Sequence, residues 1–393
     1  MATPVALAQC RTYDEAQVRA AMEKLLGALG GMGRFVQSGQ TVLLKPNLLS
    51  DHLPSAAVTT HPAVVRELIG LVRQAGGQPV VADSAASAIK IERVWATTGF
   101  GAMCAAERVP LLNLEKAGAR RFEFQGQSLA IAKPILEADV LINVPKLKTH
   151  MLTVLTNAVK NLYGTLPGYQ KTMLHKHFPD AISFSRLLAE LYAIVRPALT
   201  VSDAIVAMEG HGPSAGEPLA CGLLAASADG VALDTARCQL LGINPQRVPY
   251  LRFLQEAGTG QTDWQALELS GDPPAQLELR PLRLPRALSG KPIPDWLHRW
   301  AWRYLWTRPV ITDRCRACGL CVQACPVEAL SMAQGARPEL NYSRCIQCCC
   351  CHEVCPAQAI NMQQSPLLAT RERVLSGIMR AYGWGKRQLG RPR

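Results

Sequence analysis

Ten of the fourteen cysteines lie between Cys315 and Cys355, in two runs with the same spacing. In each run two residues separate the first three cysteines, three residues precede the fourth, and a proline follows it. This spacing is typical of bacterial ferredoxins with two [4Fe-4S] clusters, in which the fourth cysteine of each run binds the other cluster. The pattern therefore predicts two [4Fe-4S] clusters and electron transfer. We expect one cluster to be held by Cys315, Cys318, Cys321 and Cys355, and the other by Cys345, Cys348, Cys351 and Cys325.

Other readings of these cysteines are two zinc sites, a disulfide scaffold, or a pair of clusters with a purely structural role. Zinc sites usually contain paired Cys-x2-Cys knuckles, whereas here four cysteines follow one another in x2, x2, x3 order. Cys349 and Cys350 are not needed as ligands, so they are small buried residues, spare ligands or redox-active thiols. The isolated cysteines are expected in the core: Cys10, Cys104, Cys221 and Cys238.

Short apolar runs alternate with amphipathic stretches in the first two thirds of the chain, which predicts an α/β domain with a mostly parallel sheet and flanking helices. After an N-terminal strand, the predicted strands are Thr41–Leu44, Pro79–Ala82, Val140–Val144, Leu199–Val201 and Gly222–Ala226. Two helices are predicted at Pro62–Ala75 and Ile182–Val195, with apolar residues at helical spacing. The cysteine module would then form a small C-terminal α+β domain of the bacterial ferredoxin type.

Each predicted strand is followed by charged or amide side chains. Because ligands of open parallel sheets bind beyond the carboxyl ends of the strands, five such ends indicate one shared polar site. The groups are Lys45 and Asn47; Asp83 and Ser84; Lys146, Lys148 and His150; Ser202 and Asp203; and Ser227, Asp229 and Asp234.

The segment from Thr149 onward is expected to be helical, with Thr149 as its N-cap. Thr153, Asn157, Lys160 and Asn161 would then share one face. The N-terminus of this helix and the neighbouring lysines would attract a phosphate or carboxylate. His150 is either a general acid or base, a metal ligand, or a plain surface residue.

The stretch Met208–Pro218 contains three glycines and two prolines around Glu209 and His211, which predicts an exposed functional loop. Its spacing matches neither of the common nucleotide-binding motifs, so nucleotide binding is poorly supported.

Several of these motifs resemble the family catalogued as domain of unknown function 362, over roughly residues 40–257. The matching segments are Lys45-Pro46-Asn47, Val144–His150, Ala158–Gly164, Asp203 with Glu209–Pro213, and the region of Asp229 and Asp234. The resemblance implies an iron-sulfur protein of the same fold, often fused to a ferredoxin module, without an assigned reaction. It also implies site status for Lys45, Asn47, Lys146, Lys148, His150, Asn157, Lys160, Asn161, Asp203 and Glu209.

Composition divides the chain into an α/β domain (1–269), a Pro-rich linker with a Trp-rich helix (270–308), a two-cluster ferredoxin domain (309–364) and a basic tail (365–393). The Trp-rich helix holds four tryptophans between Trp296 and Trp306; it either docks the ferredoxin domain, lies in a membrane interface or stacks on nucleic acid. The tail carries seven basic residues against one acidic residue and either keeps the protein soluble or contacts an acidic partner or a membrane.

The formal net charge of +12 favours acidic partners. The N-terminus lacks the features of a signal peptide and no apolar stretch approaches 18 residues, so we expect a cytoplasmic protein without a transmembrane helix. Peripheral membrane contact is compatible with the charge, whereas nucleic-acid binding rests on charge and tryptophan alone and is not expected.

The leading hypothesis is an iron-sulfur electron-transfer protein that delivers electrons to a cationic site on the α/β domain, where a small anionic substrate or cofactor binds. His150, Lys146, Lys148, Asp203 and Glu209 are the candidate catalytic residues of such an oxidoreductase, and Lys45, Asn47, Asn157, Lys160 and Asn161 the candidate ligand-binding residues. The alternative is a non-catalytic electron carrier, or an assembly or docking factor for a partner redox enzyme.

Overall fold

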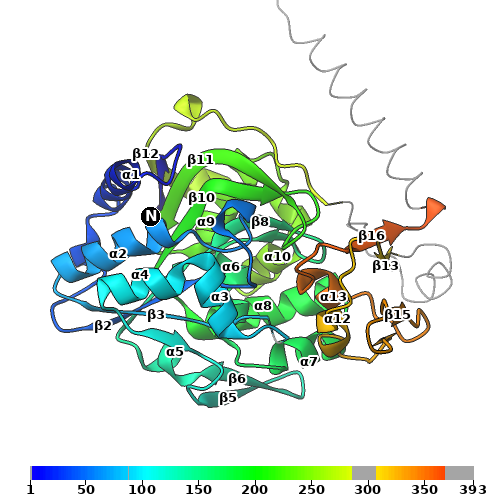
Figure 1. The fold of residues 1–393 in the computed structure, drawn as a ribbon. Helices are drawn as coiled ribbons and strands as arrows, with labels where there is room; N and C mark the ends of the chain where they lie inside the picture. The colour runs from blue at the N-terminus through cyan, green and yellow to red at the C-terminus, as the bar shows by residue number, and fades with distance from the viewer. Residues whose placement is uncertain (1, 87, 286–306, 368–393) are drawn as a thin grey trace, which may run out of the picture.

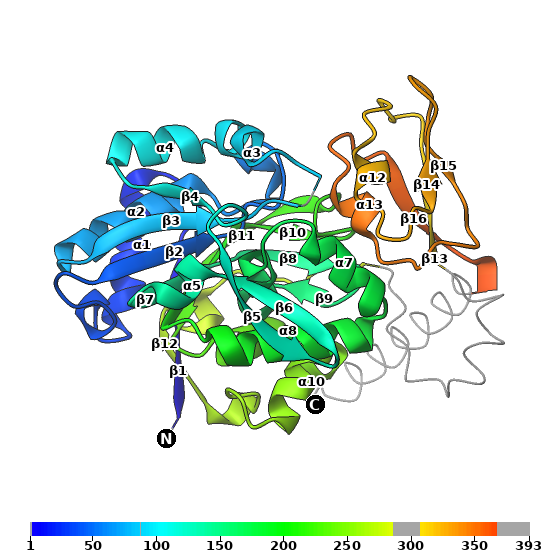
Figure 2. The ribbon, with the colours of Figure 1, turned by 90° about the horizontal axis from the view of Figure 1, so that it is seen from below.

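The computed structural model describes residues 2–86, 88–285 and 307–367, and it shows an α/β domain with a small cysteine-rich module against one side (Figures 1 and 2). The strands of the main sheet are β1 (Thr3–Gln9), β2 (Thr41–Pro46), β3 (Gln78–Asp83), β4 (Leu111–Asn113), β7 (Val140–Val144), β8 (Lys146–His150), β9 (Val154–Thr156), β10 (Leu199–Glu209), β11 (Glu217–Ser227) and β12 (Leu267–Gly271). A separate hairpin consists of β5 (Ala119–Phe124) and β6 (Gln127–Ala132).

The main sheet has the strand order β12-β1-β11-β10-β7-β2-β3-β4, with β8 and β9 added beside β10. Strands β10, β7, β2, β3 and β4 are parallel to one another, and only β11 and β9 run antiparallel to the strands they pair with. The sheet is therefore mostly parallel, as predicted from the alternation of strand and helix patterns.

Helices cover both faces of this sheet. They are α1 (Glu15–Gly27), α2 (Pro62–Gln74), α3 (Ile91–Thr98), α4 (Phe100–Glu107), α5 (Lys133–Glu137), α6 (Ala158–Asn161), α7 (Gln170–His177), α8 (Ala181–Val195), α9 (Gly230–Leu240) and α10 (Pro249–Glu256). In β2, Val42 and Leu44 pack in the core with α1 to α4, whereas Leu43 packs in the core with α8 and α10. This alternation follows from the two-residue period of a strand.

Two strand ends differ from the predicted arrangement. Strand β11 runs antiparallel to β10, so its carboxyl end at Ser227 lies beside Thr200, at the start of β10. Strand β10 continues to Glu209, which places Asp203 inside the strand and not beyond its end. The prediction of five convergent strand ends is therefore wrong for these two strands.

The predicted helix from Thr149 is also wrong. Residues 146–150 form β8 and residues 154–156 form β9, and the helix begins only at Ala158. The segment is rich in β-branched residues, which favour extended structure. His150 Nδ1 also accepts hydrogen bonds from the backbone N–H groups of Leu152 and Thr153, which supports a turn between the two strands.

The buried carboxylate of Asp234 fixes the start of the short helix α6. It accepts hydrogen bonds from the N–H groups of Ala158 (2.9 Å) and Val159 (3.1 Å) and from the hydroxyl of Tyr250 (3.0 Å). The first two N–H groups of the helix are thus capped by the protein itself and are not available to an anion.

The cysteine module contains β13 (Thr307–Ile311) paired antiparallel with β16 (Ile360–Gln364), β14 (Leu330–Ser331) paired with β15 (Glu339–Leu340), and the short helices α12 (Leu320–Gln323) and α13 (Cys350–Glu353). Its two halves share an unusual backbone. Left-handed residues recur 30 positions apart: Ala317 and Gln347, Gly319 and Cys349, Glu328 and Gln358. The module therefore has the internal repeat that the two cysteine runs predict.

The module docks on the connection between β10 and β11. The hydroxyl of Ser214 donates to His352 O (3.2 Å), and Gln358 Nε2 donates to Ser214 O (3.0 Å). Ser214 is buried, so the stretch predicted as an exposed functional loop is in part an interface between the two domains. Met151, Cys349 and Met362 form a small apolar cluster in the same interface.

Parts of the predicted linker and tail cannot be compared with the structure. The Trp-rich segment and the tail from residue 368 onward lie outside the described residues, whereas Leu277 and Leu282 of the predicted linker are buried against the α/β domain. Among the described helices, none has the length and apolar character needed to cross a membrane.

We predict that Asp234→Ala lowers the free energy of unfolding by about 3 kcal/mol, because it leaves two buried N–H groups of α6 without acceptors. The matched control is Asp180→Ala, which removes the exposed N-cap of α8 and should cost about 1 kcal/mol. Urea unfolding under anaerobic conditions measures both values. Equal losses would contradict the role given to Asp234.

Candidate functional site

The predicted cluster ligands line two separate cavities in the module. Cys315, Cys318, Cys321 and Cys355 line one of them. The other is lined by Cys325, Cys345, Cys348 and Cys351, together with the extra residues Cys349 and Cys350. The folded chain thus gathers the cysteines into the two sets expected from their spacing, with the fourth cysteine of each run beside the first three of the other.

Each set of cysteines surrounds a cavity, as a bound cluster requires. Within the described residues, no three His, Cys, Asp or Glu side chains converge closely enough to hold one ion, although each set surrounds a cavity. Backbone N–H groups also face the sulfurs: Ala329 N lies 3.1 Å from Cys325 Sγ, and Ala359 N lies 3.2 Å from Cys355 Sγ. Such N–H groups stabilise thiolates and tune cluster potentials.

A third cavity, of about 80 Å³, lies where the α/β domain meets the module. Its walls carry four lysines from four different elements: Lys45 of β2, Lys148 of β8, Lys160 of α6 and Lys171 of α7. All four are at least nine-tenths buried. We call this space the lysine cavity.

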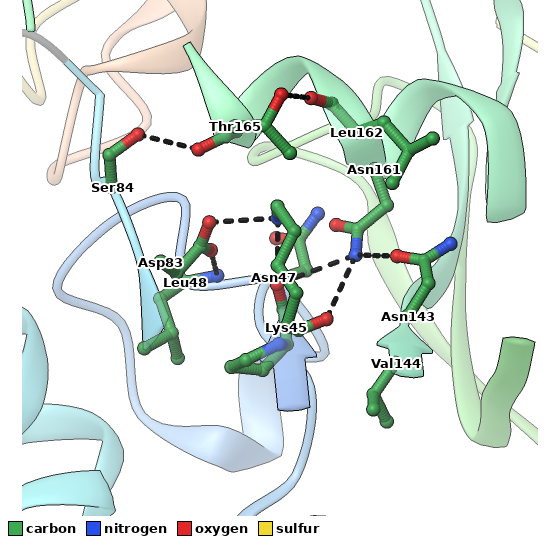
Figure 3. Close-up of polar contacts among 12 residues, drawn as sticks. Lys45, Asn47, Leu48, Asp83, Ser84, Asn143, Val144, Asn161, Leu162 and Thr165 are labelled. Carbon is green, nitrogen blue, oxygen red and sulfur yellow. Dashed lines mark hydrogen bonds and ion pairs between the residues drawn. The ribbon is translucent and has the colours of Figure 1, made fainter. Parts of the chain in front are cut away.

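Of the four lysines that line the cavity, Lys45 forms an ion pair with a carboxylate. Its Nζ lies 2.8 Å from Asp83 Oδ1, while Asp83 Oδ2 accepts from the N–H of Leu48 (Figure 3). A Cβ atom on Gly164 would approach Asp83 Oδ1 to 2.6 Å and Lys45 Nζ to 2.7 Å. Glycine at this position therefore leaves room for the ion pair.

Asn161 links this pair to the neighbouring strand. Its amide nitrogen donates to Asn143 Oδ1 (2.8 Å) and lies 3.4 Å from the carbonyl oxygens of Lys45 and Pro46 (Figure 3). These contacts tie α6 to the carboxyl ends of β2 and β7, at the floor of the cavity.

Lys148 and Lys160 have no carboxylate within ion-pair distance among the described residues. Lys148 Nζ donates to Val58 O (2.7 Å) and weakly to Asn47 Oδ1 (3.3 Å). Burial, reinforced by the charge of Lys160, lowers the pKa of Lys148 to about 7. Burial also lowers the pKa of Lys160, whose Nζ lies 5.7 Å from the ring centres of Tyr163 and Phe184.

The helix α7 adds Lys171 and His175 to the cavity. Lys171 Nζ donates to Ser84 Oγ (2.6 Å) and to the carbonyl of Ala85, and burial lowers its pKa to about 8. His175 stacks on Phe184 at 4.3 Å, and burial lowers its pKa to about 4. His175 is therefore neutral at physiological pH, and its Nδ1 has no hydrogen-bond partner among the described residues.

The module closes the cavity with Ala324, Cys350, Glu353 and Val354. Cys350 lines both the lysine cavity and the cavity of the second cysteine set. Cys349 and Cys350 are buried, as expected for small residues beside a cluster. Cys349 has a positive φ of 67°, where the equivalent residue of the first half is Gly319.

Glu353 meets His150 across the interface, with 3.1 Å between Oε1 and Nε2. Burial, together with the charge of Lys160, lowers the pKa of His150 to about 3. Because Nδ1 accepts two backbone N–H groups, the neutral ring carries its proton on Nε2, facing Glu353. Burial alone would raise the pKa of Glu353, but His150 and Lys160 outweigh it and hold the pKa well below the usual range.

The structure thus places five of the ten predicted α/β site residues on the lysine cavity: Lys45, Asn47, Lys148, Lys160 and Asn161. His150 lies behind its wall and contacts Glu353. The other four lie elsewhere.

Lys146 and Asp203 form a buried pair (2.9 Å) that the hydroxyl of Tyr13 completes, 2.6 Å from Lys146 Nζ and 2.9 Å from Asp203 Oδ1. Neither residue lines the lysine cavity. The prediction grouped them with Lys148 because they follow or adjoin strand ends. In the structure, Lys146 pairs with Asp203 of β10 whereas Lys148 pairs with Met208, and a register shift lies between the two pairs, so the two lysines have different partners.

Glu209 and Asn157 also have partners away from the cavity. Arg280 binds Glu209 with two contacts of 2.8 and 2.9 Å, and the N–H of Arg283 donates to it at 3.0 Å. Asn157 accepts from Ser202 Oγ at 2.7 Å, at the start of α6. Both residues hold neighbouring segments in place.

Sequence reasoning did not select Lys171, His175, Glu353 and Cys350 as site residues. Asp83 was noted after its strand but given no role. Lys171 and His175 share one face of α7 at i, i+4 spacing, which offered a weak signal. Glu353 comes from the other domain, so only the docking of the module reveals it.

Comparisons with known proteins agree with both parts of this description. The model of the family "Domain of unknown function (DUF362)" matches residues 42–239, which is half of the chain. The chain belongs to the DUF362 family. A "4Fe-4S binding domain" matches residues 308–331, which hold the first cysteine run, so the module is a 4Fe-4S ferredoxin domain.

One relative of this DUF362 protein is the "Thylakoid-associated protein sll1697" of Synechocystis sp. (strain ATCC 27184 / PCC 6803 / Kazusa). It is 36% identical over 263 residues, which cover 67% of this chain and 82% of the relative. Among solved structures, the lactate racemase apoprotein from Thermoanaerobacterium thermosaccharolyticum aligns with a TM-score of 0.40 and 14% identity. That alignment covers 61% of this chain and 57% of the racemase chain.

We predict opposite effects for two lysine substitutions in the cavity. Lys45→Met should lower the free energy of unfolding by about 3–5 kcal/mol, because it leaves Asp83 as a buried charge without a partner. Lys160→Met should leave stability unchanged or raise it, since among the described residues this buried ammonium has no carboxylate within ion-pair distance. Anaerobic urea unfolding compares the two variants, and a similar large loss in both would contradict the charge assignment.

Proposed function

We propose that this DUF362 protein is an electron-transfer protein with two [4Fe-4S] clusters, and that the lysine cavity binds a small anionic substrate or cofactor that receives the electrons. The single observation that carries the proposal is the position of Cys350 in the walls of both the lysine cavity and the second cysteine cavity. A group in the lysine cavity would be separated from the second cluster by little more than this side chain.

The residues that would hold the clusters are the two cysteine sets, Cys315, Cys318, Cys321 and Cys355, and Cys345, Cys348, Cys351 and Cys325. The 4Fe-4S family model covers the first run only. The repeated left-handed positions and the repeated N–H contacts to Cys325 and Cys355 support the second cluster. Each bound cluster would supply one electron at a time.

The difference in solvent exposure between the two cysteine sets supports a direction for electron entry. Cys318 of the first set is exposed to solvent, whereas Cys348 of the second set is buried, and its neighbour Cys350 lines the lysine cavity. An external donor protein would therefore approach the first set, and Arg314 and Arg316 beside it are exposed and suit an acidic donor.

On the cavity side, the roles of the residues follow from their contacts. Lys148 and Lys160 would bind the anion, Lys45 and Asn161 would hold the floor in place, and the neutral imidazole of His175 is available as a hydrogen-bond donor or acceptor. Lys148, with a pKa of about 7, can hold or release a proton near neutral pH.

The alternative is a non-catalytic electron carrier, or an assembly or docking factor for a partner enzyme. It is favoured by the exposure of Cys318, which suits exchange with another protein as well as it suits delivery to an internal site. In that case, anions in the lysine cavity would leave the clusters unaffected.

The cytoplasm remains the proposed compartment, and we propose peripheral contact with a membrane surface in addition. The name of the Synechocystis relative supports the membrane contact, and the net charge of +12 suits an anionic surface. Co-sedimentation with anionic vesicles, at two salt concentrations, tests this part of the proposal.

We predict about eight irons and eight sulfides per chain in protein purified without oxygen, with magnetically coupled EPR signals after dithionite reduction. Cys348→Ser should reduce the iron content by up to half, because it removes a proposed ligand of the second cluster. Cys350→Ser, its neighbour but not a proposed ligand, is the matched control and should retain full iron content. Zinc in place of iron and sulfide would remove electron transfer from the proposal.

A further inference from the structure

The lysine cavity carries more positive than negative charge. Among the described residues, the cavity is lined by four lysines, Lys45, Lys148, Lys160 and Lys171, and by two carboxylates, Asp83 and Glu353. Asp83 forms an ion pair with Lys45. Glu353 Oε1 lies 3.1 Å from Nε2 of the neutral His150. With all six groups ionised, the side chains lining the cavity carry an excess of two positive charges. This excess attracts anionic groups, both a ligand in the cavity and the thiolate-bound second cluster proposed behind Cys350.

Two neutral polar groups in the walls also have no partner among the described residues. They are the hydroxyl of Thr156 and Nδ1 of His175, both of which are more than nine-tenths buried. Buried polar atoms are nearly always hydrogen-bonded, so groups without partners that share one cavity indicate a missing polar occupant. Lys160 Nζ likewise has no carboxylate within ion-pair distance among the described residues, and it lies 5.7 Å from the ring centres of Tyr163 and Phe184.

The volume limits the size of this occupant. The cavity measures about 80 Å³, and one water molecule needs roughly 10–15 Å³ by the same measure. The space therefore accommodates about five to eight non-hydrogen atoms, as in a tetrahedral oxyanion or a short dicarboxylate. A nucleotide or a nicotinamide cofactor is larger than this volume and would extend beyond it.

We propose that the lysine cavity is a binding site for a compact dianion, a tetrahedral oxyanion group or a short dicarboxylate, held between Lys148 and Lys160. The inference rests on the proposed function for the role of the ligand, but the binding itself does not depend on electron transfer. Two anionic oxygens would match the two unpaired ammonium groups, and further oxygens would accept from Thr156 and contact His175.

Binding of a dianion is coupled to protonation of Lys148. The charged and titratable groups that act on this ammonium from the surrounding elements are Lys146, Lys160, Asp83, Glu353 and His52. Without ligand, Lys148 has a pKa of about 7 and is mostly neutral at pH 8. An adjacent dianion favours the charged form, so binding at pH 8 takes up protons and affinity declines as the pH rises above 7.

Titration calorimetry of the anaerobic full-length holoprotein, with sulfate as the probe, tests this site. Sulfate keeps its two charges throughout pH 6–9, so any pH dependence belongs to the protein. Oxalate and succinate test the dicarboxylate form, and acetate is the singly charged control. We expect one site per chain for sulfate or for a dicarboxylate, with acetate at least tenfold weaker.

Lys148→Met and Lys160→Met should each weaken binding of the dianion at least tenfold, which corresponds to one charge-assisted hydrogen bond. Lys176→Met is the matched control, since Lys176 is exposed on the same helix as Lys171, and it should bind as the parent does. Calorimetry at pH 8 in two buffers of different ionisation enthalpy should show proton uptake by the parent and less uptake by Lys148→Met.

The outcomes separate this inference from the proposed function. Full iron content and reducible clusters without dianion binding would overturn the inference and leave electron transfer standing. Dianion binding by anaerobically purified protein that contains zinc in place of iron and sulfide would support the site and remove the electron-transfer role. Binding that is equally strong in both lysine variants, or equal for acetate, would overturn the site.

Discussion

The burial of lysine ammonium groups at the edge of the α/β sheet is the constraint on which the rest of this structure depends. An ammonium group loses most of its hydration when it is buried, and the protein recovers this loss only through carboxylates, carbonyl oxygens or a ligand. Lys45 and Lys146 each have a carboxylate within 3 Å, and Lys171 has oxygens of Ser84 and Ala85. Lys148 has the carbonyl oxygen of Val58 but no carboxylate within ion-pair distance, and Lys160 likewise has no such carboxylate among the described residues.

The ferredoxin module also helps to compensate the buried ammonium groups. It brings the carboxylate of Glu353 toward Lys160 and His150, and it covers the cavity with Cys350 and Val354. Docking of the module therefore does two things with one surface. It screens buried positive charge, and it brings the second cysteine set next to the space where that charge is concentrated. The hydrogen bonds of Ser214 and Gln358 keep this surface in register.

Much of this arrangement could be predicted from the sequence where the signal is local. The cysteine spacing identified the two sets that line the module's cavities, and the apolar alternation identified the mostly parallel sheet. The helix predicted from Thr149 failed because helical spacing of polar residues outweighed the β-branched residues of the same segment. Asp203 was assigned to a strand end because β10 continues well past the apolar run that defined it.

The composition of the cavity was predictable only in part. Lys45, Asn47 and Lys148 follow or end strands, so the geometry of a parallel sheet brings them together. Glu353 and Cys350 come from another domain, and no pattern in the chain indicates which face of the ferredoxin module docks. Likewise, Glu209 and Asp203 share the polar character of site residues, but their partners Arg280 and Tyr13 are distant in sequence.

The central claim is that the lysine cavity and the second cluster are electrostatically and functionally coupled through the wall that contains Cys350. An EPR-monitored redox titration of the anaerobic holoprotein, with and without saturating sulfate, tests it most directly. We expect two cluster potentials. One of them becomes more negative with sulfate, because a nearby dianion opposes the addition of negative charge to the cluster. In Lys160→Met, sulfate should leave both potentials unchanged. Unchanged potentials in the parent protein, or equal shifts of both clusters, would contradict the account.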